Sequence, residues 1–229
     1  MNTETLNFET PDGATTAVVT LPADANGDSN AVVLIHEWWG INAHIRDLAS
    51  RYARAGYICV APDLFRGQTT TDQQQASKLM HNLALDDGIA IINQSIEASR
   101  AKYGVEKFAV TGYCMGGTFA LRAACLNPKL AAAAAFYGDL PEDEVLAQLK
   151  IPTIFFAGAR DNWITPEKVE QLEDAARTHG LPLEAVSYDA DHAFFNDTRP
   201  EVYNPEAAAD AWQRTLKLFG EMLGSKQAQ

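Results

Sequence analysis

The segment from Gly112 to Gly117, which reads Gly-Tyr-Cys-Met-Gly-Gly, constrains the fold of this chain more than any other. It follows an apolar strand-like run over 106–111 and precedes a helix-like run over 118–125. A turn that joins a strand to a helix this abruptly leaves little room for side chains, and glycine removes that obstacle. The spacing therefore predicts a sharp strand–turn–helix unit with Cys114 at its apex.

The rest of the chain alternates strand-like and helix-like segments. Apolar runs typical of strands cover residues 14–21, 31–35, 57–61, 106–111, 131–137, 151–157 and 183–188. Helical patterns cover 44–55, 72–102 as one or two helices, 118–125, 166–178 and 205–223. The alanine-rich run 131–137 fits either element by composition, and we favour a strand because Gly138 and Pro141 lie too close for a helix.

Continuous apolar strands that alternate with helices predict an α/β fold. We expect a mostly parallel sheet with helices on both faces. Since no repeat, low-complexity segment or linker interrupts the pattern, we expect one domain over residues 1–229.

Charge and cysteine content exclude several classes of protein. The net charge of −12, without a basic run, argues against binding to nucleic acid or an anionic membrane surface. No apolar run approaches the ~20 residues of a membrane span, and the polar start lacks a signal peptide, so we expect a cytoplasmic protein. Cys59, Cys114 and Cys125 show neither a disulfide framework nor a metal-binding spacing. No unusually apolar surface stripe is evident, which favours a monomer.

Cys114 has the setting of a catalytic nucleophile. A nucleophile flanked by glycines between a strand and a helix is the nucleophile elbow of α/β-hydrolases. The glycine cluster alone would also fit a packing turn or a variant phosphate-binding loop, although it lacks the lysine and the glycine spacing of those loops. In such sheets the site lies at the carboxyl ends of the strands.

Two further residues complete a triad in the order expected of that fold. Asp161 follows the strand-like run 151–157, and His192 follows the run 183–188. The chain order nucleophile, acid, histidine is that of the α/β-hydrolases. We expect His192 to take the proton of Cys114 and Asp161 to orient the imidazole.

The segment His36-Glu37-Trp38-Trp39-Gly40 directly follows the strand-like run 31–35. In α/β-hydrolases the loop at this place supplies one backbone N–H to an oxyanion hole, and the residue after the nucleophile supplies the other. Here those residues are Trp38 and Met115. Glu37 lies at the end of a buried strand, so its carboxylate needs a hydrogen-bonding or charged partner.

Taken together, the motifs of this chain resemble those of the dienelactone hydrolase family. The matching motifs, from about residue 5 to 222, are His36-Glu37-Trp38-Trp39-Gly40, Pro62-Asp63-Leu64, Gly112 to Gly117, Gly158-x-x-Asp161-x-x-x-x-Pro166 and Asp191-His192-x-Phe194. The resemblance implies a carboxymethylenebutenolidase-like hydrolase with a Cys–His–Asp triad, a thioester intermediate and no metal or organic cofactor. It also implies that Glu37 interacts with the resting thiol and is displaced when substrate binds, so that a thiolate forms on demand.

The chain departs from this family where a substrate carboxylate would bind. Family members hold that carboxylate with two arginines, one near residue 75 and one four residues past the catalytic histidine. Here residues 71–78 contain no arginine, and Asn196 occupies the second position. The candidate substrate-binding residues are Arg66, Lys78, Arg199 and Tyr137. A small-molecule lactone or ester is thus a better expectation than dienelactone itself. The alternatives are a thioesterase or small-peptide hydrolase on the same fold and a non-catalytic binding protein.

Overall fold

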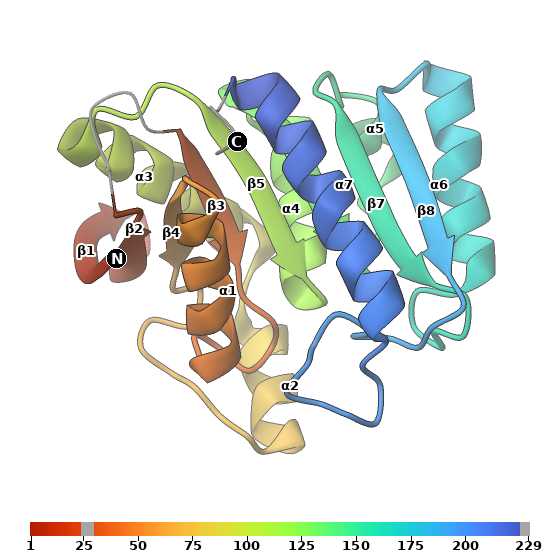
Figure 1. Ribbon diagram of the computed structural model, residues 1–229, viewed down its shortest axis with the longest axis horizontal. Coiled ribbons are helices and arrows are strands. Elements are labelled where there is room, and N and C mark those ends of the chain that lie inside the picture. The colour runs from red at the N-terminus through yellow and green to blue at the C-terminus, as the bar shows by residue number, and fades with distance from the viewer. Residues whose placement is uncertain (24–29, 225–229) are drawn as a thin grey trace.

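The computed structural model describes residues 1–23 and 30–224 and contains an eight-stranded sheet in the order β1-β2-β4-β3-β5-β6-β7-β8 (Figure 1). The strands are Asn2–Thr10 (β1), Gly13–Leu21 (β2), Ala31–Ile35 (β3), Ile58–Pro62 (β4), Phe108–Tyr113 (β5), Leu130–Phe136 (β6), Thr153–Gly158 (β7) and Leu183–Tyr188 (β8). The pairings from β4 through β8 are parallel, whereas β1 pairs with β2, and β2 with β4, in antiparallel fashion. The sheet is therefore mostly parallel, as the sequence predicts.

Helices cover both faces of this sheet. They are Ala43–Arg54 (α1), Gln73–Asn82 (α2), Leu85–Tyr103 (α3), Met115–Leu126 (α4), Asp143–Leu146 (α5), Pro166–His179 (α6) and Pro205–Leu223 (α7). Figure 1 shows α1 and α7 in front of the strands, and their apolar side chains form one core layer with that face. Apolar side chains of α3, α4 and α6 form the second layer against the opposite face. The central strands are buried on both sides, which explains their continuous apolar sequences.

The sequence prediction missed β1 and the four-residue helix α5. β1 is an edge strand in which only Leu6 is buried, so its polar sequence carries no apolar run. The helical pattern over 72–102 forms two helices, because the chain is extended at Leu83 and Ala84 between α2 and α3.

The turn after β5 is as tight as its glycines suggest. Cys114 has φ of 56° and ψ of −119°, a left-handed conformation that a side chain disfavours. A Cβ on Gly112 would lie 2.0 Å from the backbone oxygen of Gly116, and one on Gly116 would lie 2.3 Å from that of Ile35. Since backbone atoms cannot rotate away, both positions require glycine. The turn therefore fixes Cys114 at the carboxyl edge of the sheet, between β5 and α4.

Candidate active site

Asp161 and His192 meet beside the cysteine turn. Asp161 lies in the loop after β7, where its Oδ1 accepts the backbone N–H groups of Trp163 at 2.8 Å and Ile164 at 3.0 Å. Its Oδ2 accepts a hydrogen bond from Nδ1 of His192 at 2.6 Å. Burial alone would raise the pKa of Asp161, but the hydrogen bond and charge of His192 outweigh burial and lower it. An ionised carboxylate can only accept, so the proton of a neutral His192 is on Nδ1 and its Nε2 is free to act as a base.

The thiol of Cys114 lies against two backbone amides. The backbone N–H groups of Met115 and Trp38 lie near its sulfur and favour the ionised thiol. Burial, followed by the charge of Glu37, raises the pKa of Cys114 to about 12 despite these two amides. Nε2 of His192 is buried and has no hydrogen-bond partner among the residues that the structure describes. The thiol is thus protonated at neutral pH.

Glu37 is a buried carboxyl group beside this thiol, with 2% of its surface exposed. Its Oε2 accepts a hydrogen bond from Nδ2 of Asn196 at 2.9 Å. Burial raises the pKa of Glu37 to about 7, against the opposing effects of the Arg199 charge and the Asn196 bond. Glu37 therefore changes charge in the neutral pH range.

His36 fixes the backbone that carries Glu37 and Trp38. Its Nδ1 donates to the carbonyl oxygen of Glu37 at 2.6 Å, and its Nε2 accepts the backbone N–H of Leu64 at 3.1 Å. Both ring nitrogens are satisfied by the neutral form, and burial lowers the pKa of His36. The ring therefore links the loops that follow β3 and β4 through hydrogen bonds to both.

Two cavities meet at Cys114 and His192. One has a volume of about 490 Å³ and is lined by polar groups that include Glu37, Arg160 and Arg199. The other, of about 530 Å³, is lined by side chains that include Met80, Met115, Tyr137, Ile164 and Lys168. Both also border Trp38 and Trp163. The arrangement gives a substrate carbonyl at Cys114 room on either side.

The profile of the dienelactone hydrolase family matches residues 15–223 of this chain. The chain belongs to the dienelactone hydrolase family. A predicted carboxymethylenebutenolidase of Yersinia pestis is 33% identical over 220 residues, which cover 89% of this chain and 82% of that protein. The crystal structure of a predicted dienelactone hydrolase from Klebsiella pneumoniae has a TM-score of 0.89 at 29% identity and covers 96% of this chain and 98% of that one.

A dienelactone hydrolase-like phosphotriesterase from metagenomic libraries has a TM-score of 0.88 at 20% identity, again over 96% of this chain and 98% of that one. That likeness concerns the fold alone. Together the relatives show that the chain has an α/β-hydrolase fold and is a hydrolase that acts on esters or lactones.

The four candidate substrate-binding residues occupy different places in this hydrolase. Arg199 lines the polar cavity, and Tyr137 is buried at the other cavity with its ring centroid 5.0 Å from that of His192. Arg66 instead pairs with Asp87 at 2.6 Å, and Lys78 is an exposed residue of α2. The structure does not bring these last two to either cavity.

Sequence reasoning did not single out Trp163, although it borders both cavities. Trp163 is 57% exposed, and its ring lies edge-on to His192, with the ring centroids 4.9 Å apart, and to Trp38, at 5.8 Å. Its position two residues after Asp161 is the signal that could have identified it.

Within residues 1–23 and 30–224, no group of three or more His, Cys, Asp or Glu side chains is arranged to hold a metal ion. No helix in the described part of the chain is long and apolar enough to cross a membrane.

Proposed function

We propose that this member of the dienelactone hydrolase family cleaves a lactone or ester by transferring its acyl group to Cys114. The observation that supports this most directly is the 2.6 Å hydrogen bond from His192 to Asp161, which leaves Nε2 of the imidazole without a hydrogen-bond partner among the described residues, in a side chain that lines both cavities together with Cys114. A nucleophile at a strained elbow, a base and an acid that orients the base are the three parts that acyl transfer requires.

The first half of the reaction forms a thioester. The proton of the thiol passes to Nε2 of His192 while the sulfur of Cys114 attacks the carbonyl carbon. The resulting oxyanion accepts the N–H groups of Trp38 and Met115, each of which contributes about 3 kcal/mol in comparable enzymes. Collapse breaks the carbon–oxygen bond, and the departing alkoxide takes the proton from Nε2. In a lactone this alcohol stays attached to the acyl group.

The second half regenerates the enzyme. A water molecule gives a proton to Nε2 of His192 as its oxygen attacks the thioester carbon. Collapse of the second oxyanion expels the sulfur of Cys114, which recovers the proton, and releases a carboxylic acid.

Glu37 delays the first step until a substrate is present. At rest the amides of Trp38 and Met115 act on the sulfur itself, and the charge of Glu37 disfavours a thiolate. A substrate carbonyl oxygen that takes over these amides releases the thiol toward His192. We therefore propose that Cys114 is activated by substrate, which also limits its oxidation in the absence of substrate.

The substrate we propose is a lactone or ester with no requirement for the dienelactone carboxylate. Asn196 is bonded to Glu37 where family members have an arginine. Arg199 is a cation of the polar cavity and the candidate to receive an acidic group.

Pre-steady-state hydrolysis of an activated aryl ester tests the proposal. The wild type should release a burst of aryl alcohol close to one equivalent, and Cys114→Ala should show neither burst nor turnover. An equal rate in the two proteins would refute a cysteine nucleophile. Absence of turnover in both, together with no acylation of Cys114, would favour a non-catalytic binding protein. Comparing kcat/KM for lactones, esters and acyl thioesters then separates a lactonase from a thioesterase.

A further inference from the structure

Asn196 is a buried polar residue whose side chain has one orientation. Its Oδ1 accepts two bonds from Thr198, the backbone N–H at 3.1 Å and the hydroxyl at 2.6 Å. Because a backbone N–H can only donate, the oxygen of the Asn196 amide must face Thr198. The NH₂ group is then forced toward Glu37, where it donates to Oε2 at 2.9 Å. The amide can therefore serve Glu37 as a donor but not as an acceptor.

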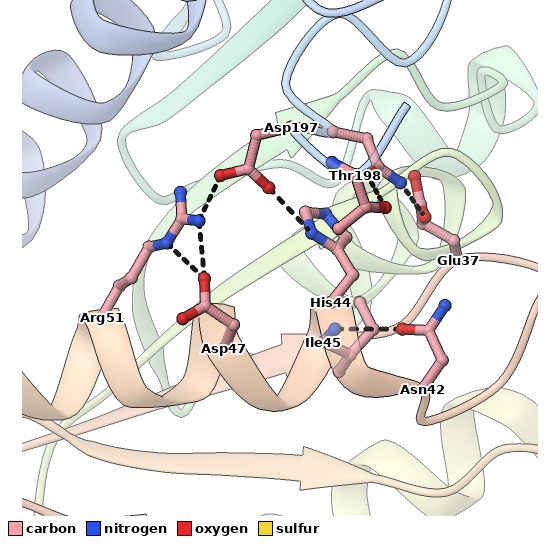
Figure 2. Close-up of polar contacts among 9 residues, drawn as sticks. Glu37, Asn42, His44, Ile45, Asp47, Arg51, Asp197 and Thr198 are labelled. Carbon is pink, nitrogen blue, oxygen red and sulfur yellow. Dashed lines mark hydrogen bonds and ion pairs between the residues drawn. The ribbon is translucent and has the colours of Figure 1, made fainter. Parts of the chain in front are cut away.

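The segment that carries Asn196 is tied to α1 on the far side. Figure 2 shows the Asp197 carboxylate between Arg51 and His44 of α1. It forms an ion pair with the Arg51 guanidinium, and its Oδ1 lies 3.5 Å from Nδ1 of His44. Asp47 holds Nε of the same arginine at 2.7 Å. These contacts restrain the backbone beside Asn196.

The charge of Glu37 depends on this donor. Burial disfavours its ionised form, whereas the Asn196 bond and the nearby Arg199 guanidinium favour it. Cys114 and Tyr137 are the titratable groups whose pKa the Glu37 charge raises in turn. A donor that favours ionised Glu37 therefore keeps the thiol of Cys114 protonated.

We propose that Asn196 is a positioning residue that holds the Glu37 carboxylate beside Cys114 and so suppresses the resting reactivity of the thiol. It acts through Glu37 and does not itself touch the reacting atoms. The inference rests on the proposed function in taking Cys114 as the reactive thiol, and it adds the residue that controls when the thiol can ionise.

The test is the pH profile of Cys114 alkylation by iodoacetamide, followed by peptide mass spectrometry so that Cys59 and Cys125 do not contribute. Asn196→Leu keeps a similar volume but removes the donor, so Glu37 should stay protonated to higher pH. Alkylation at pH 8 should then be up to about tenfold faster than in the wild type, since a fall of one unit in the pKa of Cys114 raises the thiolate population tenfold. At pH 5.5 Glu37 is protonated in both proteins, and the two rates should agree.

Glu37→Gln is the matched control variant. It should show the same acceleration at pH 8, and adding Asn196→Leu to it should change nothing further. A rise at both pH values, or an equal rise in the Glu37→Gln background, would mean that the substitution merely opens the site and would overturn the proposal. So would an unchanged profile. If Asn196→Leu does not fold, as judged by circular dichroism, Asn196→Ala also removes the donor and is expected to give the same result.

This test can fail without refuting the proposed function, because alkylation of Cys114 needs no turnover. Turnover retained in Cys114→Ala would refute the nucleophile, whereas a flat response to Asn196→Leu would refute the positioning role alone.

Discussion

Asp161→Asn should nearly abolish activity while leaving the fold intact. The Oδ1 position of this side chain accepts the N–H groups of Trp163 and Ile164, which an amide nitrogen cannot accept. The asparagine oxygen should therefore keep that place and turn its NH₂ group toward Nδ1 of His192. Nδ1 must then accept, so the proton moves to Nε2 and the imidazole can no longer take the proton of Cys114. A wrong tautomer of this kind costs about 10⁴ in kcat, or about 5 kcal/mol of transition-state stabilisation.

The assay is kcat/KM for an aryl ester at pH 7.5, with thermal unfolding measured on the same preparations. We expect a loss near 10⁴-fold and a melting temperature close to that of the wild type, since the two side chains have the same shape. A loss smaller than tenfold in a folded variant would refute Asp161 as the residue that orients His192.

Two further predictions concern stability. Gly116→Ala should lower the free energy of unfolding by about 3 kcal/mol, because the added Cβ would lie 2.3 Å from the backbone oxygen of Ile35; a urea titration that finds a change below about 1 kcal/mol would contradict the packing argument. Burial raises the pKa of Glu37 from 4.5 to about 7, so its effect on stability is nil below pH 4.5 and becomes unfavourable as pH rises to about 7. The free energy of unfolding of the wild type should thus fall by about 3 kcal/mol between pH 4.5 and 8, and Glu37→Gln should remove this fall when both proteins are unfolded in urea. An equal fall of the unfolding free energy with pH in the variant would contradict the prediction.

Much of the fold could be predicted because the central strands are buried on both faces. Their apolar runs stand out from the helices between them, and the glycines of the elbow are dictated by backbone contacts. β1 could not be recognised in this way, because as an edge strand it presents mostly polar side chains and its pairing with β2 is made by backbone groups. Such a polar sequence resembles that of a loop, and only the adjoining Asp12-Gly13 turn indicates a hairpin.

The sequence predicts those residues of the candidate site that lie directly after a strand. Parallel strands end at one edge, so the positions of Asp161 and His192 in the sequence imply their meeting. The contact of Glu37 with Asn196 joins positions 159 residues apart and depends on a loop that no local pattern describes. Likewise, the sequence could not exclude Arg66 from the cavities, because its partner Asp87 is identified only by the packing of α3.

The covalent mechanism is tested most directly by the mass of the enzyme after acid quenching during turnover of an activated ester. One acyl group per chain is expected, located by peptide mapping on Cys114 and absent from Cys114→Ala. An acyl group on another residue, or turnover without any acylated enzyme under conditions that show a burst, would contradict the covalent mechanism.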